Sequence, residues 1–219
     1  MEFEKIYNKG QAQLFKNGYL EYLTKTHPLV IWGMYLPIII LLPIYAFNYV
    51  EFSVGNIVLW FLGGMFFWSL FEYVMHRFVF HYTAHTERGK RINYVLHGNH
   101  HEYPRDKERL FMPAAPSLII ASTLFFIYWL IIGKNIFAFF PGFMLGYLIY
   151  GSMHYAIHAW NPPFKWMKGL WRNHHLHHYK QDHRGFGVSS TLWDHVFGTM
   201  FDLKNEKEDK EKVKELMYN

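Results

Sequence analysis

The sequence predicts an all-α integral membrane protein in which four transmembrane helices form two hairpins and carry a cytosolic helical cap. Charged residues make up only 18% of the 219 residues, against about 25% in soluble domains. Four stretches of 19 to 24 residues contain no Lys, Arg, Asp or Glu, and a helix needs about 20 mostly apolar residues to cross a bilayer. All the basic residues lie outside these stretches, and all except Lys134 lie on one predicted side of the membrane.

The four expected spans follow one another in pairs along the chain. The first contains Pro37 and Pro43, where we expect a kink rather than a break, because lipid makes a helix satisfy its own backbone hydrogen bonds. Pro113 and Pro116 precede the third, so we expect that helix to begin near Ser117. The expected spans are residues 29–50, 52–71, 117–133 and 135–153.

The distribution of Lys and Arg predicts the side of the membrane that each segment faces. Segments 1–27, 72–109 and 154–219 hold 4, 7 and 10 of these residues, and the short connections around Glu51 and Lys134 hold one between them. By the positive-inside rule, both termini and the middle segment are cytoplasmic. The polar N-terminus is not typical of a signal peptide, and the expected membrane is the endoplasmic reticulum or the bacterial inner membrane.

We therefore expect a single domain over residues 1–219, with a cap formed by residues 72–109 and 154–203. Residues 204–219 are rich in Lys and Glu, which is typical of a solvated helical tail. The net charge of +5 is explained by anionic lipid headgroups rather than nucleic acid, because no nucleic-acid-binding motif accompanies it.

Cysteine is absent and histidine is abundant. The absence of Cys excludes disulfide scaffolds, thiolate nucleophiles and metal clusters or haem held by Cys. Ten of the 15 histidines fall into four groups, within HRFVFH, HGNHH, HYAIH and HHLHH, all on the predicted cytoplasmic face. These ten candidate metal ligands are His76, His81, His97, His100, His101, His154, His158, His174, His177 and His178.

The spacing of these histidines suits metal binding. Residues three or four apart share a helix face, so each HxxHH group is expected to place three imidazoles on one stripe, and HxxxH two. His76 and His81 are five positions apart, which is about 140° around an ideal helix. We therefore expect a helix end or a distortion between them. Imidazole is the commonest side-chain metal ligand, and ten of them suit two ions with about five each.

The donor set favours a redox metal. Two ions held mainly by imidazole, without thiolate, fit iron that activates dioxygen, and by the Irving–Williams order zinc can occupy the same site. Carboxylates that can orient ligating imidazoles stand near the groups at Glu72, Glu102, Asp182 and Asp194. The other histidines are expected to be ordinary surface or core residues: His27, His85, His175, His183 and His195.

These motifs resemble the fatty acid hydroxylase superfamily of integral membrane di-iron enzymes, and within it the sphingolipid fatty acid 2-hydroxylases. The order HX4H, HxxHH, HxxxH, HxxHH, followed by GFGVSSTLWDHVFGT, carries the resemblance over about residues 70 to 200. It implies a four-helix membrane core, a cytosolic helical cap, two metals held by the ten histidines, and O₂-dependent hydroxylation at C2 of a long acyl chain. Under this resemblance, Tyr150, Tyr155 and Trp193 are expected to line the acyl pocket.

The resemblance leaves the electron donor and the substrate open. The sequence has no HPGG haem motif, and 27 residues precede the first uncharged stretch. We therefore expect no bound haem, and electrons from a separate protein of the cytochrome b5 or ferredoxin type. The alternatives are a sterol or carotenoid hydroxylase or desaturase of the same superfamily, and, in another class, a metal-binding membrane protein without redox activity.

Overall fold

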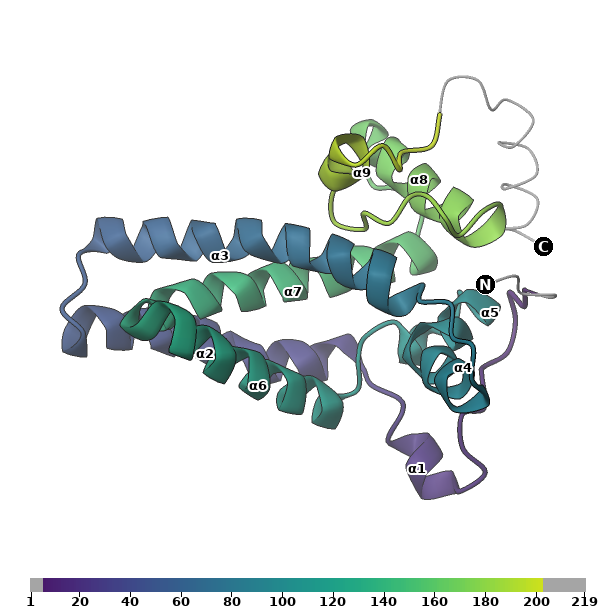
Figure 1. Ribbon diagram of the computed structural model, residues 1–219, viewed down its shortest axis with the longest axis horizontal. Coiled ribbons are helices and arrows are strands. Elements are labelled where there is room, and N and C mark those ends of the chain that lie inside the picture. The colour runs from purple at the N-terminus through teal and green to yellow at the C-terminus, as the bar shows by residue number, and fades with distance from the viewer. Residues whose placement is uncertain (1–5, 203–219) are drawn as a thin grey trace.

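The computed structural model describes residues 6–202, which are helical and contain no strand. Four long helices run side by side as two hairpins, and short helices gather at one of their ends (Figure 1). The long helices are α2 (Pro28–Tyr49), α3 (Val54–Val74), α6 (Ala114–Ile132) and α7 (Ile136–Ala159). The predicted charged tail, residues 204–219, lies outside the described residues.

The short elements begin where the sequence offers caps. The side chains of Asn17 and Thr86 accept backbone N–H groups at the first turns of α1 and α4, as Ser53 does for α3, which satisfies otherwise unpaired donors. The short elements are α1 (Gly18–Tyr22), the π-helical turn Met75–Phe80, α4 (Glu87–Asn93), the π-helical turn Tyr94–Gly98, α5 (Asn99–Glu102), the 3₁₀ turns Lys107–Arg109, Gly133–Asn135 and Lys165–Met167, α8 (Lys168–Tyr179) and α9 (Leu192–Val196).

The helix boundaries differ from the sequence prediction mainly at two places. The prediction that the third long helix begins near Ser117 is wrong, because α6 begins at Ala114 and includes Pro116 in its first turn. Proline is tolerated there, since the N–H that it lacks has no intrahelical partner. In addition, α7 continues six residues beyond position 153 and carries His154 and His158 on its last turns.

By length and composition, three helical segments are able to cross a membrane: Pro28–Tyr49, Val54–Phe80 and Lys107–Ala159. The third contains both α6 and α7, which reverse direction at the turn Gly133–Asn135. Gly133 has a φ of 57° there, a backbone conformation that glycine adopts at little cost.

Helices α3 and α7 approach each other closely because glycines face the crossing. A Cβ atom on Gly142 would lie 1.9 Å from the carbonyl oxygen of Phe61, and one on Gly64 would lie 2.1 Å from that of Phe139. Small residues allow the backbones of two helices to come into contact. In lipid this close packing matters, because the hydrophobic effect does not drive helices together. This crossing sets the position of the histidines at the ends of both helices.

We expect Gly142→Val to lower the stability of the protein by about 1–3 kcal/mol, because the added side chain must push α3 away from α7. The thermal midpoint in detergent measures this effect. Gly63→Val is the matched control, since a Cβ atom on Gly63 meets nothing within 4 Å. Equal midpoints for the two variants would contradict the proposed packing.

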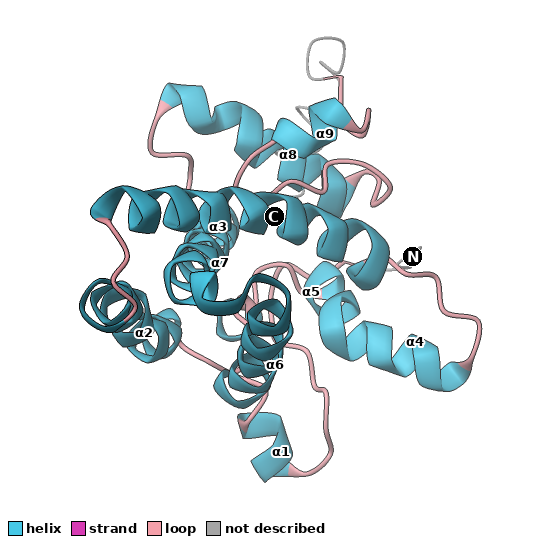
Figure 2. Cartoon of the chain, turned by 60° about the vertical axis from the view of Figure 1, so that its left-hand side comes forward, coloured by secondary structure: helices cyan, strands magenta, loops and turns pink. Residues whose placement is uncertain are grey.

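The cap lies where α2 and α6 begin and α3 and α7 end (Figures 1 and 2). Helices α4 and α5 follow α3 in the chain, and α8 and α9 follow α7. Each histidine motif lies in the cap, in the π-helical turn that directly follows α3, or on the last turns of α7. The fold therefore brings all four motifs to the same end of the molecule.

Candidate metal centre

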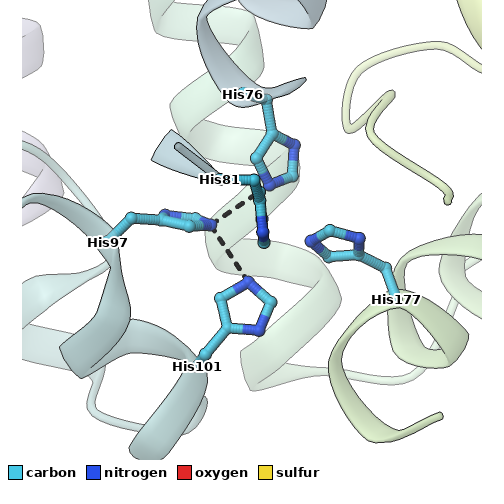
Figure 3. A group of neighbouring side chains, drawn as sticks. All are labelled: His76, His81, His97, His101 and His177. Atoms are coloured by element: carbon cyan, nitrogen blue, oxygen red, sulfur yellow. Dashed lines mark hydrogen bonds between the residues drawn. The ribbon is translucent and has the colours of Figure 1, made fainter. Parts of the chain in front are cut away.

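The ten predicted histidines meet in two groups of five, in each of which one nitrogen per residue lies within 4.8 Å of all the others. All ten except His81 are buried. Figure 3 shows the first group, whose rings converge from three separate segments. The first group is His76, His81, His97, His101 and His177, and the second is His100, His154, His158, His174 and His178.

A π-helical turn brings together the two histidines of the first motif, which are five residues apart in the chain. The helix widens over Met75–Phe80, and the His81 N–H donates to the His76 carbonyl oxygen at 3.2 Å. This i→i+5 bond defines a π-helix, a rare form that is frequent at functional sites. It brings the two imidazole centroids to 5.0 Å, so the expected distortion between His76 and His81 is confirmed.

The three histidines of each HxxHH motif divide between the two groups. The prediction that they lie on one stripe of a helix is therefore wrong. His97 and His101 belong to the first group, while His100 belongs to the second. In the last motif, His177 joins the first group and His174 and His178 the second. Adjacent residues on a helix point about 100° apart. Both segments that carry an HxxHH motif therefore lie between the two groups and contribute histidines to each.

Backbone carbonyl oxygens hold several of the rings in one orientation. The Nδ1 atoms of His76, His177 and His154 lie 2.6, 2.7 and 3.2 Å from the carbonyl oxygens of Phe186, Arg184 and Leu110. A carbonyl oxygen only accepts, so each Nδ1 carries the proton. The lone pair of each ring is then on Nε2, the atom that points into its group.

The inward nitrogens crowd together in both groups. The Nε2 atom of His97 lies 3.1 Å from those of both His76 and His101, and the Nε2 atoms of His100 and His154 are 2.8 Å apart. Within residues 6–202, the Nε2 atoms of His81 and His177 are buried without a hydrogen-bond partner. Buried polar atoms are normally paired, so this arrangement fits a metal ion in each group.

The imidazoles are held neutral, which is the form that binds a metal. Burial, with a smaller contribution from the neighbouring imidazoles, holds the pKa values of His97, His100 and His101 well below the ordinary value. Burial has the same effect on the pKa values of His174 and His178. Two neutral five-imidazole sets suit iron, nickel, copper or zinc better than Mg²⁺ or Ca²⁺.

Only one of the four predicted carboxylates faces a histidine of the two groups. Asp182 Oδ2 lies 3.5 Å from His81 Nδ1. Glu102 instead accepts a hydrogen bond from the Tyr94 hydroxyl at 2.5 Å. The expectation that Glu102 orients an imidazole therefore does not match its contacts.

Glu72 and Asp194 also have a different role from the one that we expected, because both hold the loop after α8. Glu72 accepts hydrogen bonds from the N–H groups of Val188 and Ser189 at 3.2 and 2.9 Å. Asp194 accepts from the N–H groups of Phe186 and Gly187 at 3.0 and 2.9 Å. They act on the imidazoles indirectly, by fixing the loop whose carbonyl oxygens hold two Nδ1 atoms.

These carbonyl groups are the part of the site that sequence reasoning missed. Leu110, Arg184 and Phe186 orient the imidazoles through their backbone oxygen atoms, and every residue carries such an oxygen. No residue type could therefore have marked them in advance.

An apolar cavity of about 490 Å³ lies against both histidine groups. His97, His100 and His154 border it, and its walls come from α2, α3, α6, α7 and the N-terminal segment. Space at its edge depends on Gly151, where a Cβ atom would lie 2.3 Å from the ring of Phe111. The cavity has the size and lining typical of a site for an apolar ligand.

Of the three aromatic residues predicted to line a substrate pocket, only Tyr150 lines this cavity, where it stacks on His154. Tyr155 packs its ring against Trp160, with centroids 5.4 Å apart. Trp193 donates its indole N–H to Ser69 Oγ at 3.0 Å. Neither Tyr155 nor Trp193 belongs to the cavity wall.

The five remaining histidines lie outside both groups. His175 is buried and forms hydrogen bonds with backbone groups of Ile157 and Trp171. His27 caps the first turn of α2 by accepting the Leu29 N–H. The other three are exposed: His85, His183 and His195.

Comparisons with known proteins agree with this geometry. A model of the fatty acid hydroxylase family matches residues 61–199. A ceramide very long chain fatty acid hydroxylase of Schizosaccharomyces pombe is 39% identical over 202 residues, which cover 90% of this chain and 57% of that relative. A dihydroceramide fatty acyl 2-hydroxylase of Arabidopsis thaliana is 34% identical over 212 residues, covering 94% of this chain and 87% of the relative.

A solved structure, described as full-length scs7p with only the hydroxylase domain visible, is similar in fold with a TM-score of 0.80 and 34% identity. The similarity covers 88% of this chain and 73% of that chain. This chain spans little more than half the length of the fission yeast relative. The family match over most of the chain, together with these relatives, shows that the chain belongs to the fatty acid hydroxylase family.

Proposed function

We propose that this protein hydroxylates a long-chain fatty acyl lipid at C2 with dioxygen, at a dimetal centre held by histidine. The observation that carries the proposal is the pair of five-imidazole groups that border one apolar cavity. The relatives are named for hydroxylation of ceramide and dihydroceramide acyl chains, so an N-acyl sphingoid lipid is the substrate class that we favour.

The ten histidines are the proposed ligands of two ions, and iron is the proposed working metal. When bound, such ions supply the redox chemistry that activates dioxygen. The overall reaction breaks one C–H bond and inserts one oxygen atom: the acyl lipid, O₂, two electrons and two protons give the 2-hydroxyacyl lipid and water. The protein's own residues orient the imidazoles, and the apolar cavity walls exclude bulk water from the acyl chain.

The same proposal assigns the membrane arrangement. Helices α2, α3, α6 and α7 cross the bilayer as two hairpins, and the cap, both termini and the metal centre lie on the cytoplasmic side. The membrane is the endoplasmic reticulum or the bacterial inner membrane, and residues 1–219 act as one domain. Electrons come from a separate donor of the cytochrome b5 or ferredoxin type that docks on the cap.

Mass spectrometry of lipids tests this function directly. We expect the iron-loaded protein, given a reducing donor, dioxygen and a long-chain N-acyl sphingoid lipid, to yield a product heavier by one oxygen atom. Fragmentation should place the hydroxyl on C2 of the acyl chain. His85→Ala, at an exposed site outside both groups, should leave the yield unchanged.

Two results would decide against the proposal. A hydroxyl on another carbon or another lipid class would favour a different substrate of the same superfamily. Stoichiometric, redox-inert zinc without oxygen uptake under reducing conditions would favour a metal-binding membrane protein.

A further inference from the structure

The N-terminal segment contributes a wall to the cavity although it lies before the region that the family model matches, residues 61–199. We call residues 14–24 the strap. Its side chains on the cavity wall are Leu14, Phe15, Leu20, Leu23 and Thr24. Leu14 is only 4% exposed, whereas Leu20 and Leu23 are 46% and 48% exposed. The strap therefore runs from the inside of the cavity to its rim.

One ion-pair cluster fixes the strap. Glu21 Oε2 accepts the N–H groups of Leu14 and Phe15 at 2.9 and 2.8 Å, and its Oε1 pairs with the Arg109 guanidinium. Arg109 also donates to Thr24 Oγ1 at 3.2 Å. The Arg109 side chain is buried, so these charge-assisted bonds are shielded from water and salt.

The rim has the character of a surface that meets lipid. Leu96, in the cap, also lines the cavity and is 48% exposed. Beside the two strap leucines, Tyr19 and Tyr22 are strongly exposed on the same short helix. Tyrosine is typical of membrane–water interfaces.

The position of the strap along the chain agrees with this character. Residues 23–27 alone separate α1 from α2, and residues 110–113 alone separate the turn containing Arg109 from α6. The strap is therefore tied to the ends of two long helices, where the proposed hydrocarbon core meets the cytoplasmic interface.

We propose that the strap is a specificity-determining wall of the active-site cavity, and that the acyl chain of a bilayer lipid enters between Leu20 and Leu23 on one side and Leu96 on the other. This inference rests on the proposed function for the identity of the lipid. The Glu21–Arg109 pair is a positioning element, because it sets the width of the opening and touches no reacting atom.

Photolabelling in vesicles tests the opening independently of catalysis. The probe is an N-acyl sphingosine with a diazirine on its acyl chain, in phosphatidylcholine vesicles that contain the full-length protein. Wild type should be labelled on the strap and on the cavity-lining residues Phe143 and Met144 of α7. The double variant Leu20→Trp/Leu23→Trp should lower labelling of α7 about tenfold by narrowing the opening.

The control is Tyr19→Trp/Tyr22→Trp, which adds indoles to the same helix at positions outside the cavity wall. In this variant the probe should label α7 as strongly as it does in wild type. Unchanged α7 labelling in the leucine variant, or an equal loss in the control, would overturn the proposal. Normal labelling together with no hydroxylation by wild type would instead refute the proposed function alone.

A second measurement tests the ion pair. Glu21→Gln should speed hydrogen exchange of the Leu14 and Phe15 amides about tenfold or more, because the acceptor of both amides loses its charge. In hydroxylation assays, Glu21→Gln should change the KM for the lipid and leave kcat unchanged. Exchange rates equal to wild type would show that Glu21 does not hold the strap.

Discussion

His100→Ala is expected to abolish hydroxylation, with a loss of at least about 100-fold, and to leave the chain with about one metal ion in place of two. The residue is buried in the second histidine group, where its Nε2 atom lies 2.8 Å from that of His154. Loss of a hydrogen-bond partner of a metal ligand already lowers affinity or activity by about 10–100-fold. Removal of a proposed ligand should cost at least as much.

His101→Ala gives a sharper version of the same test. Although His101 follows His100 directly in the chain, it belongs to the first group. Each single variant should therefore lose a different ion, and the double variant should lose both. Elemental analysis counts the metal per chain, and a spectroscopic probe that distinguishes the two sites identifies which one is empty.

Exposed His85 provides the matched control, because it lies outside both groups. His175 is a poorer control, since it is buried and bonded to the backbone, and its loss would lower stability. Full metal content in the His100→Ala variant would contradict the ligand assignment. Loss of the same ion from the His100 and His101 variants would contradict the division into two groups.

Asp194→Ala is expected to lower the stability of the protein by at least about 3 kcal/mol and to empty the first group preferentially. Its buried carboxylate accepts four hydrogen bonds, from the N–H groups of Phe186 and Gly187 and from the side chains of Asn173 and Thr199. Each buried donor that loses its partner costs about 1–3 kcal/mol.

The effect on metal follows from the loop that Asp194 holds. The Phe186 and Arg184 carbonyl oxygens in this loop orient His76 and His177, both members of the first group. Thermal unfolding in detergent and metal analysis measure the two effects together. The exposed residue Glu87 supplies a control, because Glu87→Ala should change stability by no more than about 0.5 kcal/mol. A destabilised variant with both ions in place would limit Asp194 to a role in folding.

The length and apolarity of local segments explain why much of the fold could be predicted. The uncharged stretches predicted the four long helices to within a few residues at most ends, because length and apolarity are properties of a continuous segment. The exceptions are the end of α7, six residues beyond the prediction, and the start of α6. The sequence predicts a helix start after both Pro113 and Pro116, but only Pro113 lies outside the helix.

Contacts between distant segments explain most of the differences at the site. The sequence predicts that Glu72 and Asp194 orient imidazoles, yet both bind the loop that contains residues 186–189. Tyr155 and Trp193 likewise contact Trp160 and Ser69 and do not line the cavity that Tyr150 lines. Each outcome depends on how a helix is rotated against its neighbours, which spacing within one segment does not specify.

By itself, the sequence determined the helical class, the apolar segments and the ten histidines that meet, because hydrophobicity and imidazole chemistry belong to residue types. Only the tertiary structure decided how those histidines divide into two groups, which carbonyl oxygens orient them, and that the N-terminal strap walls the cavity. The physical reason is that a metal site requires each imidazole nitrogen to point toward the ion, and residue type alone does not fix that direction. The direction of each ring is set by the π-helical turn at Met75–Phe80, by the close crossing of α3 and α7, and by backbone atoms that every sequence possesses.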